Sequence, residues 1–351
     1  MCIFLTAKRG TEFSEGNRYA KCGTCLGFSI SILLTVMSFS AFAIESQGHR
    51  GARGLLPENT LPAFEAALKI GVHTLELDVV VTADDQVVVT HNPRLEPEIT
   101  RDPDGNWLTD SGPVIRSLTL RELKRYDVGG INPDTRYATR FPHQESLERT
   151  RIPTLGEVIN LVNESGGTSV KLNIESKLFP DGPLPAATPE HFARLLVDVL
   201  RNHDFIDRAR IQSFNWSVLK EVHRIEPRLT TSFLTAEQRW MDNIKRGQPG
   251  PSPWTAGYDV DDFDGNIPKL VKQVGGDVWS SYFKEVTRSS VTQAHDQGLR
   301  VAVWTVNEET DMEYLIELGV DSIITDYPDR LINVMRRLGL PLPQAHPVLV
   351  D

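Results

Sequence analysis

The segment HTLELDVVV, residues 73–81, decides the fold. Side chains in a β-strand alternate between its two faces. One face of this segment therefore carries leucine and valine side chains, and the other carries Glu76 and Asp78. If the polar face is buried, the two carboxylates repel each other and lose hydration, so a cation or basic groups must lie beside them. The alternative is an edge strand whose polar side simply faces water.

Short apolar runs alternate with helical patterns along the chain. The predicted strands are 47–49, 74–81, 87–90, 170–175, 210–214, 230–234, 277–280, 300–305 and 322–325. The predicted helices are 61–70, 120–126, 155–162, 189–203, 216–225, 267–274, 289–296, 309–318 and 328–338. This alternation predicts parallel strands joined by helical crossovers. With one hairpin arm set aside, eight parallel strands remain, so we expect an α/β fold of the TIM-type (β/α)8 barrel class.

The hairpin arm follows a tight polar turn at residues 83–85, which leaves no room for a helix. An antiparallel hairpin is therefore predicted, with Asp78 opposite Thr90 or His91. Residues 92–153 then form a long connection rich in proline and glycine. We expect this connection to be an insertion over the carboxyl-end rim, because loops at that end build the active sites of barrels.

The amino-terminal segment has the pattern of a signal peptide. Basic residues precede an apolar run from Leu26 to Phe42, and residues 41–43, Ala-Phe-Ala, have the small-x-small form of a cleavage site. We interpret residues 1–43 as a signal peptide and residues 44–351 as the barrel domain. An uncleaved anchor helix is the alternative, but an apolar run of about 17 residues is short for a membrane span. Cleavage predicts a periplasmic or secreted protein without a stable membrane anchor.

The composition excludes some classes of partner. The chain has 351 residues, 40% of them hydrophobic, and a net charge of −10. Without residues 1–43, the remaining 308 residues carry 33 Lys and Arg against 45 Asp and Glu, a net charge of −12. This acidity argues against nucleic acid as the main partner. All three cysteines lie within residues 1–43, so we expect a mature domain without disulfides.

A second predicted strand repeats the carboxylate pattern. In residues 170–177, VKLNIESK, Glu175 and Lys177 lie on the same face. If this strand neighbours the first in a barrel, Glu76, Asp78 and Glu175 converge at one rim. Three carboxylates make a hard oxygen site that suits one divalent cation, Ca²⁺ or Mg²⁺. Lys177 could hold a phosphoryl oxygen as a point charge.

Two histidines end the first predicted strand and the hairpin. His49 lies in GHRG, residues 48–51, and His91 lies in THNP, residues 90–93. Phosphodiester hydrolysis needs a base for the attacking oxygen and an acid for the leaving oxygen, and imidazole titrates near neutral pH. Arg50 can bind phosphate through two hydrogen bonds. We therefore predict that His49 and His91 form an acid–base pair.

The order and spacing of these motifs resemble the glycerophosphodiester phosphodiesterase family. The matching segments are GHRG at 48–51, PENT at 57–60, ELD at 76–78, TH at 90–91, ESK at 175–177, WTVN at 304–307 and GVDSIITDYP at 319–328. Each motif is weak alone, but together they are specific. The resemblance covers about residues 46–338.

The resemblance implies hydrolysis of deacylated phospholipids such as glycerophosphocholine to an alcohol and glycerol 3-phosphate. It also implies that a substrate hydroxyl attacks first and forms a cyclic phosphate, which water then opens. The residues carried over are Glu76, Asp78 and Glu175 for the metal, with Glu58 as an outer ligand; His49 and His91 for acid–base catalysis; Arg50 and Lys177 for phosphate; and Trp304 for the glycerol wall, with Phe283 or Trp279 beside it.

One position departs from the family pattern. Many members carry aspartate after the second histidine, whereas this chain has Asn92. Asparagine can still orient a neighbouring side chain by hydrogen bonding, but it supplies no charge. The departure leaves both histidines and all three carboxylates in place.

Two other functions remain open at this point. The first is a related barrel phosphodiesterase that acts on intact or lyso-phospholipids, which would need an exposed apolar rim. The few apolar runs in residues 92–153 favour a soluble substrate instead. The second is a non-catalytic protein that captures glycerophosphodiesters, against which the retained histidines and carboxylates argue.

Overall fold

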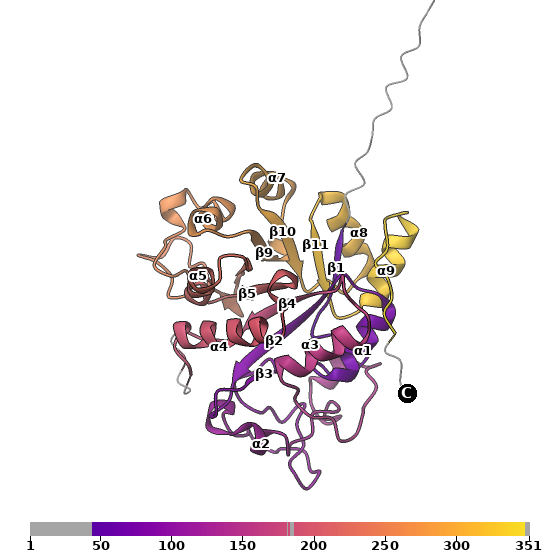
Figure 1. Cartoon of the computed structure of the whole chain (residues 1–351). Helices are drawn as coiled ribbons and strands as arrows, with labels where there is room; N and C mark the ends of the chain where they lie inside the picture. The colour runs from indigo at the N-terminus through magenta and orange to yellow at the C-terminus, as the bar shows by residue number, and fades with distance from the viewer. Residues whose placement is uncertain (1–43, 181, 183–185, 348–351) are drawn as a thin grey trace, which may run out of the picture. The chain divides into compact units, whose positions relative to one another are not determined.

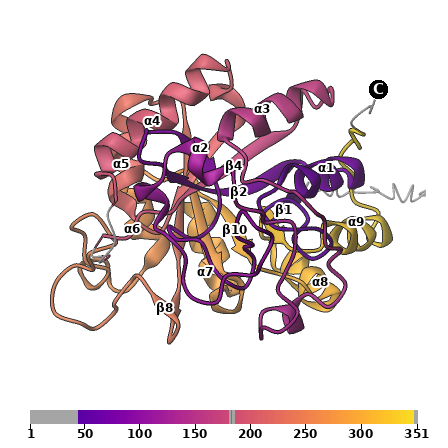
Figure 2. The ribbon, with the colours of Figure 1, turned by 90° about the horizontal axis from the view of Figure 1, so that it is seen from below.

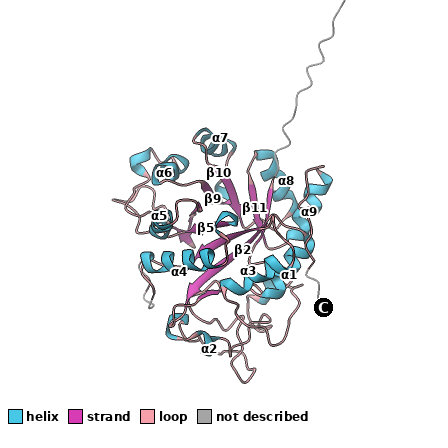
Figure 3. Ribbon diagram, in the orientation of Figure 1, coloured by secondary structure: helices cyan, strands magenta, loops and turns pink. Residues whose placement is uncertain are grey.

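The protein is described by a computed structural model, which covers residues 44–180, 182 and 186–347. In it, β1 (Glu45–Gly48) pairs in parallel with β11 (Ser322–Thr325) and with β2 (Thr74–Val81), so the sheet closes on itself. The other parallel strands are β4 (Lys171–Ser176), β5 (Ala209–Ser213), β6 (Thr230–Thr235), β9 (Val278–Tyr282) and β10 (Arg300–Trp304). The predicted barrel of eight parallel strands is confirmed (Figure 1, Figure 3).

The expected signal peptide, residues 1–43, lies outside the described residues. Among the helices that the structure does describe, none has the length and apolar character needed to cross a bilayer.

Helices surround the barrel as an outer layer (Figure 1). They are α1 (Leu61–Ile70), α3 (Leu155–Glu164), α4 (Pro189–Asn202), α5 (Trp216–Ile225), α6 (Ile267–Val274), α7 (Arg288–Asp296), α8 (Glu309–Leu318) and α9 (Pro328–Arg337). Each matches its predicted range to within two residues at either end. Local capping explains this agreement. At the start of α3, for example, Thr154 Oγ1 accepts from the Glu157 N–H, and the Glu157 carboxylate accepts from the Thr154 N–H.

The apolar side chains of the strands pack against this helix layer. Leu75, Leu77 and Val79 of β2 are fully buried in the main hydrophobic core, as the alternation of the sequence predicts. The opposite face of β2 points into the barrel and carries Glu76 and Asp78, which are also buried.

Amide side chains fill the middle of the barrel. Asn173 Nδ2 lies 2.9 Å from both Gln47 Oε1 and Gln212 Oε1. Gln212 Nε2 in turn donates to Glu76 Oε1 at 2.7 Å. These hydrogen bonds pair most of the buried amide groups, although Asn173 Oδ1 has no partner among the described residues. They also fix the Glu76 side chain at the carboxyl end of the barrel.

Glu45 lies at the amino end of the barrel between two arginines. Its Oε2 is 3.1 Å from Arg210 Nη2 and 2.8 Å from Arg300 Nη2, and its Oε1 accepts from Thr74 Oγ1 at 2.7 Å. Burial raises the pKa of Glu45, but the two guanidinium groups and the hydroxyl outweigh burial and lower the pKa to about 2.

We expect Glu45→Gln to lower the free energy of unfolding at pH 7 by about 3 kcal/mol, because Arg210 is left buried without its counter-charge. The folded pKa of Glu45 is below its ordinary value of 4.5. The stabilisation is therefore complete above about pH 4.5 and is lost as the pH falls towards 2. Urea denaturation of both proteins across this range would measure it. Equal unfolding free energies for the two proteins at pH 7 would contradict the assignment.

The predicted hairpin is also confirmed. β3 (Val87–Val89) pairs antiparallel with β2, with Val89 opposite Val79. The Thr90 N–H donates to the Asp78 carbonyl oxygen at 2.9 Å, which places these two residues opposite each other. His91 is thereby returned to the end of β2 from which the hairpin starts.

Residues 92–153, the segment that carries α2 (Leu120–Leu123) in Figure 2, share a small apolar core with β2 and β3. Its members are Val80, Val88, Leu95, Ile115, Leu123, Val128 and Ile152. The helix predicted at 120–126 is shorter, because α2 covers only Leu120–Leu123. The Arg125 and Tyr126 N–H groups bond to carbonyls three residues earlier, so the chain tightens there and leaves the α-helical ladder.

Candidate active site

A pocket of about 920 Å³ opens at the carboxyl ends of the barrel strands. Strand ends and the residues just after them contribute His49, Glu76, Glu175, Lys177, Gln212, Phe214, Tyr282, Trp304 and Asp326. The 92–153 segment contributes Asn92, Glu96, Glu98, Ile99, Tyr137 and Arg140. The pocket therefore lies where barrel enzymes carry their active sites.

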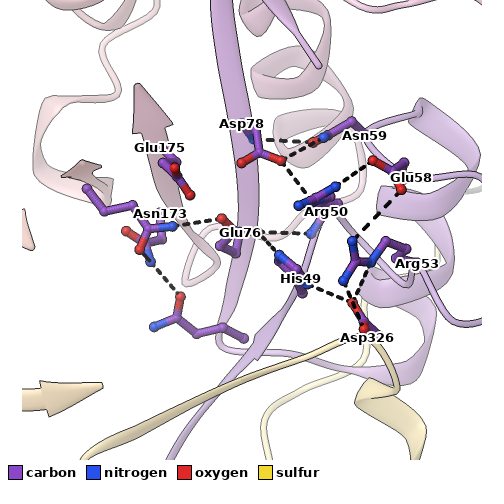
Figure 4. A network of polar contacts seen from close by, with 12 residues as sticks. His49, Arg50, Arg53, Glu58, Asn59, Glu76, Asp78, Asn173, Glu175 and Asp326 are labelled. Atoms are coloured by element: carbon purple, nitrogen blue, oxygen red, sulfur yellow. Dashed lines mark hydrogen bonds and ion pairs between the residues drawn. The ribbon is translucent and has the colours of Figure 1, made fainter. Parts of the chain in front are cut away.

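Three carboxylates meet at the base of this pocket (Figure 4). One oxygen from each of Glu76, Asp78 and Glu175 lies within 4.8 Å of the others. The convergence follows from the register, because β2 and β4 are neighbours and Asp78 lies opposite Glu175. All three side chains are buried. The structure thus brings together the three residues predicted to meet at one rim.

Repulsion within this cluster is reflected in the pKa values. Burial and the carboxylates of Asp78 and Glu175 raise the pKa of Glu76 well above its ordinary value. Burial raises the pKa of Glu175 to about 7; Asp78 adds to this effect, and Lys177 offsets only part of it. Burial acts on Asp78 in the same direction, but Lys177 and Arg50 keep the pKa of Asp78 well below its usual range.

Two basic side chains hold Asp78 as a carboxylate. Lys177 Nζ lies 3.0 Å from Asp78 Oδ1 and 2.5 Å from Glu175 Oε1. Arg50 Nε lies 3.0 Å from Asp78 Oδ2, and its Nη1 is 2.6 Å from Glu58 Oε1. Glu58 therefore contacts Arg50 and stands outside the cluster of three. Lys177 and Arg50 both line the pocket. Their positive charges partly neutralise the neighbouring carboxylates.

The donor set fits a divalent cation. The connected ion pairs contain five carboxylates, Glu58, Glu76, Asp78, Glu175 and Asp326, and three permanent cations, Arg50, Arg53 and Lys177. The carboxylates outnumber the permanent cations by two. The pKa is raised at Glu76 and Glu175, two of the three converging carboxylates. One divalent ion at the three converging oxygens would balance the two excess negative charges, and oxygen donors suit Ca²⁺ or Mg²⁺.

A left-handed turn after β1 positions the backbone next to these carboxylates. Arg50 has φ 52° and Gly51 has φ 84°. The Arg50 N–H donates to Glu76 Oε2 at 3.0 Å. A Cβ at Gly51 would lie 2.6 Å from the Ala63 carbonyl carbon, so only glycine lets the turn approach α1 this closely.

His49 is held by a carboxylate on the last strand of the barrel. Its Nδ1 lies 2.6 Å from Asp326 Oδ1, and its Nε2 lies 3.9 Å from Glu76 Oε2 (Figure 4). Because a carboxylate only accepts hydrogen bonds, Nδ1 carries a proton. Burial and Arg53 lower the pKa of His49 to about 4, although Asp326 opposes them.

Sequence reasoning assigned no role to Asp326, Arg53 or Asn307. Arg53 binds Asp326 through two hydrogen bonds, Nε to Oδ1 at 2.7 Å and Nη2 to Oδ2 at 3.0 Å. Asn307 Nδ2 donates to Asp326 Oδ2 at 2.7 Å. The available signal was a carboxylate immediately after the last predicted strand. In the structure His49 follows β1 just as Asp326 follows β11, and Gly48 lies opposite Thr325.

His91 lines the same pocket and lies just beyond the end of the hairpin. Its Nδ1 is hydrogen-bonded to the Asn92 side-chain oxygen. Burial, Arg50 and Lys177 lower the pKa of His91 well below its ordinary value. The two predicted histidines thus line one pocket, and each uses Nδ1 for a neighbouring side chain.

Aromatic rings form one wall of the pocket. Trp304 packs against Phe214 at 5.4 Å between ring centroids and against Tyr282 at 5.8 Å. Phe283 also lines the pocket, next to Tyr282. The expectation for Trp279 was wrong, because its side chain is only 2% exposed in the core and its indole N–H donates to Thr235 Oγ1. In β9 it points outward from the barrel, towards the helices.

Comparison with known proteins decides the family. The sequence profile of the "Glycerophosphoryl diester phosphodiesterase family" matches residues 49–330, a range that holds every predicted site residue. The chain belongs to the glycerophosphoryl diester phosphodiesterase family. By homology over most of its length, it is a glycerophosphodiester phosphodiesterase, a phosphoric diester hydrolase.

Individual glycerophosphodiester phosphodiesterases support this assignment. One from Caldanaerobacter subterraneus is 29% identical over 302 residues, 83% of this chain and 97% of the relative. A crystal structure from Silicibacter pomeroyi, assigned to the glycerophosphoryl diester phosphodiesterases, is 36% identical with a TM-score of 0.75, over 86% of this chain and 95% of that one.

A third structure resembles this glycerophosphodiester phosphodiesterase in its fold. It is an Oleispira antarctica phosphodiesterase in complex with the product sn-glycerol-3-phosphate. It is 22% identical with a TM-score of 0.61, over 84% of this chain and 98% of that one.

Proposed function

We propose that the protein hydrolyses glycerophosphodiesters, such as glycerophosphocholine, to an alcohol and glycerol 3-phosphate with the help of one divalent cation, Ca²⁺ or Mg²⁺. The observation that carries the proposal is the meeting of three buried carboxylate oxygens within 4.8 Å, in a pocket lined by two histidines. The glycerol 3-phosphate bound to the Oleispira antarctica phosphodiesterase is consistent with the proposed product.

In this proposal His49 and His91 share the roles of general base and general acid. Each ring directs Nδ1 to a neighbouring side chain, which leaves Nε2 for proton transfer to or from substrate. The lowered pKa of each ring favours the neutral form at pH 7, which suits the ring that acts as the base. The ring that acts as the acid must carry a proton on Nε2 when it donates to the leaving oxygen. Asp326 fixes the His49 ring and stabilises the positive charge that forms when His49 accepts one.

The phosphate group would be bound where the positive charges gather. Arg50 and Lys177 line the pocket beside the carboxylates, and both can bind phosphoryl oxygens. Glu76, Asp78 and Glu175 would hold the cation, whose chemistry is to stabilise negative charge on the phosphoryl oxygens. Trp304 would form the wall for the glycerol part of the substrate.

Turnover separates this enzyme from a non-catalytic binding protein. Purified protein with glycerophosphocholine and Ca²⁺ or Mg²⁺ should release glycerol 3-phosphate over many turnovers, detected by coupled oxidation of that product. Stoichiometric binding of glycerophosphocholine without release of product would favour the binding protein and contradict the proposal.

The aromatic wall supports a second candidate, hydrolysis of lyso-phospholipids. Among the described residues only five large apolar side chains are exposed, and two of them lie at this pocket: Trp240, 61% exposed, and Phe179, 46% exposed. Trp240 packs against Trp304 at 6.1 Å between centroids. The apolar surface therefore runs from the proposed glycerol wall to the rim, where it could bind an acyl chain attached to the glycerol.

If an acyl chain binds this rim, Trp240→Ala should lower kcat/KM for lysophosphatidylcholine by about tenfold, the effect of losing one large buried contact. Turnover of glycerophosphocholine, which has no acyl chain, should stay within about twofold. Tyr314→Phe is a matched control at an exposed aromatic residue outside the pocket. Absence of lysophosphatidylcholine turnover by the unaltered protein would exclude this second candidate.

We further propose export through a cleaved signal peptide at residues 1–43, with a periplasmic or secreted mature protein. The support is the basic and apolar pattern that ends at Ala43, next to β1, which starts at Glu45. Amino-terminal sequencing of the protein exported from a bacterial host should begin at or near Ile44. A mature protein that keeps the apolar run would show an uncleaved anchor instead.

A further inference from the structure

The Glu58 carboxylate holds the guanidinium group of Arg50, one of the two residues proposed to bind phosphate. Its Oε1 accepts from Arg50 Nη1 at 2.6 Å (Figure 4). Arg50 Nε lies 3.0 Å from Asp78 Oδ2 as an ion pair, but without the geometry of a hydrogen bond. Among the described residues, Glu58 is therefore the only one that accepts a hydrogen bond from this guanidinium group. The direction of the Arg50 side chain thus depends on how the Glu58 carboxylate is turned.

A second arginine lies beside the same carboxylate. Arg53 Nη1 is 3.9 Å from Glu58 Oε2, which is too far for a hydrogen bond. The other two nitrogens of the Arg53 guanidinium group donate to Asp326, so Nη1 is the atom that attracts Glu58. A rotation of the Glu58 carboxylate towards Arg53 would weaken its hydrogen bond with Arg50. The position of Oε2 therefore decides which arginine Glu58 binds.

The hydroxyl group of Tyr137 holds Oε2 in place. Tyr137 Oη donates a hydrogen bond to Glu58 Oε2. Burial and the Glu58 carboxylate raise the pKa of Tyr137, so the hydroxyl keeps its proton and can act as the donor. The two oxygens of Glu58 are thus divided between two partners, Oε2 with Tyr137 and Oε1 with Arg50. All three side chains line the pocket that holds the carboxylate cluster.

Contacts that do not involve the hydroxyl hold the Tyr137 ring. The ring packs edge-on against the buried Phe141, with 5.4 Å between ring centroids. A few residues further on, Gln144 Nε2 donates to the Arg53 carbonyl oxygen at 2.7 Å, which fastens this part of the chain to the loop after β1. The 92–153 segment therefore presents the hydroxyl group from a fixed position.

We propose that Tyr137 is a positioning residue for Arg50 and acts through the Glu58 carboxylate. By binding Oε2 it keeps Oε1 on Arg50, so the guanidinium group stays where it can bind the phosphate of the substrate. The 92–153 segment then does more than surround the pocket, because it sets the geometry of a phosphate-binding side chain at the pocket base. The proposal rests on the proposed role of Arg50 in binding phosphate.

Tyr137→Phe tests the proposal because it removes the hydroxyl and keeps the ring. Glu58 can then turn towards Arg53, so we expect KM for glycerophosphocholine to rise about five- to tenfold, the effect of one lost hydrogen bond. We expect kcat to change by less than about twofold, because Arg50 would bind the phosphate both before and during the reaction. An unchanged KM in Tyr137→Phe would overturn the proposal.

Tyr126→Phe is the matched control. Tyr126 belongs to the same 92–153 segment, but it packs against the small apolar core and does not line the pocket. Its KM for glycerophosphocholine should therefore equal that of the unaltered protein. A rise in KM as large as that of Tyr137→Phe would show that any tyrosine of this segment has the effect, and would overturn the role of the Glu58 contact.

A double variant separates positioning through Glu58 from a direct contact between Tyr137 and the substrate. Glu58→Ala removes the carboxylate through which Tyr137 acts. Adding Tyr137→Phe to it should therefore raise KM by less than about a further twofold, because both changes break the same chain of contacts. A full additional rise of about five- to tenfold would mean that the hydroxyl acts on the substrate itself, and the positioning role would be wrong.

A binding measurement keeps this inference distinct from the proposed function. Titration calorimetry with glycerol 3-phosphate, in the presence of Ca²⁺ or Mg²⁺, should give a dissociation constant about five- to tenfold higher for Tyr137→Phe than for the unaltered protein. Equal dissociation constants for the two proteins would overturn the positioning role even if the enzyme is active. An unaltered protein that binds glycerol 3-phosphate but hydrolyses no glycerophosphodiester would count against the proposed function alone.

Discussion

Replacing His49 with alanine is expected to lower kcat for glycerophosphocholine by about 10²- to 10⁴-fold, the usual contribution of one general acid or base. His91→Ala should have an effect of the same order, because each ring presents Nε2 to the pocket. Release of glycerol 3-phosphate by purified variants would measure both effects. Circular dichroism should show an unchanged fold, because Asp326 keeps its ion pair with Arg53 when the imidazole is removed.

The exposed His143 provides the control for these variants. It lies in the 92–153 segment but does not line the pocket, so His143→Ala should keep full activity. Asp326→Asn should also lower kcat, since an amide can present either its oxygen or its NH₂ group to His49 and no longer fixes the tautomer. Normal turnover in His49→Ala or in His91→Ala would refute the acid–base assignment of that residue.

Removal of divalent cations should lower turnover by about 10²-fold or more, because stabilisation of phosphoryl charge is worth several kcal/mol. Activity should return when Ca²⁺ or Mg²⁺ is added back. The metal should also raise the free energy of unfolding, by about 2.7 kcal/mol at 100 times its dissociation constant. Thermal denaturation with and without the metal gives this second measurement. Full activity in the presence of a strong chelator would argue against the metal site.

Carboxylate variants locate the site. Glu175→Ala should raise the metal concentration needed for half-maximal activity sharply, and Glu76→Gln should abolish the stabilisation by metal. Glu148→Gln, on an exposed side chain outside the pocket, is the matched control. An unchanged metal titration in Glu175→Ala would contradict the assigned role of Glu175.

Local rules were enough to predict the barrel and the carboxylate cluster. The alternation in β2 separates its apolar and acidic faces, and the short turn at residues 83–85 forces a hairpin whose register returns His91 to the end of β2. Capping boxes at Thr119 and Thr154 mark where helices begin. Each of these signals lies within a few residues of the feature it predicts.

Contacts between distant segments were harder to predict. Asp326 meets His49 and Arg53 only because the first and last strands of the barrel are neighbours, and no local sequence pattern shows which side chains meet where these strands end. The same limit explains the error at Trp279. The strand predicted at residues 277–280 did not show which of its two faces points into the barrel. The direction of the Trp279 side chain in β9 was therefore undecided.

The hydrogen bond between His49 and Asp326 joins side chains 277 positions apart, at the ends of the strands that close the barrel. A truncated chain that stops before β11 would lack this carboxylate and would leave the edges of β1 and β10 open to pairing with other chains. The proposed acid–base site is therefore complete only when the last strand has closed the barrel. Recovery of activity during refolding should report the docking of the last strand, and partly assembled barrels should be inert towards phosphodiesters.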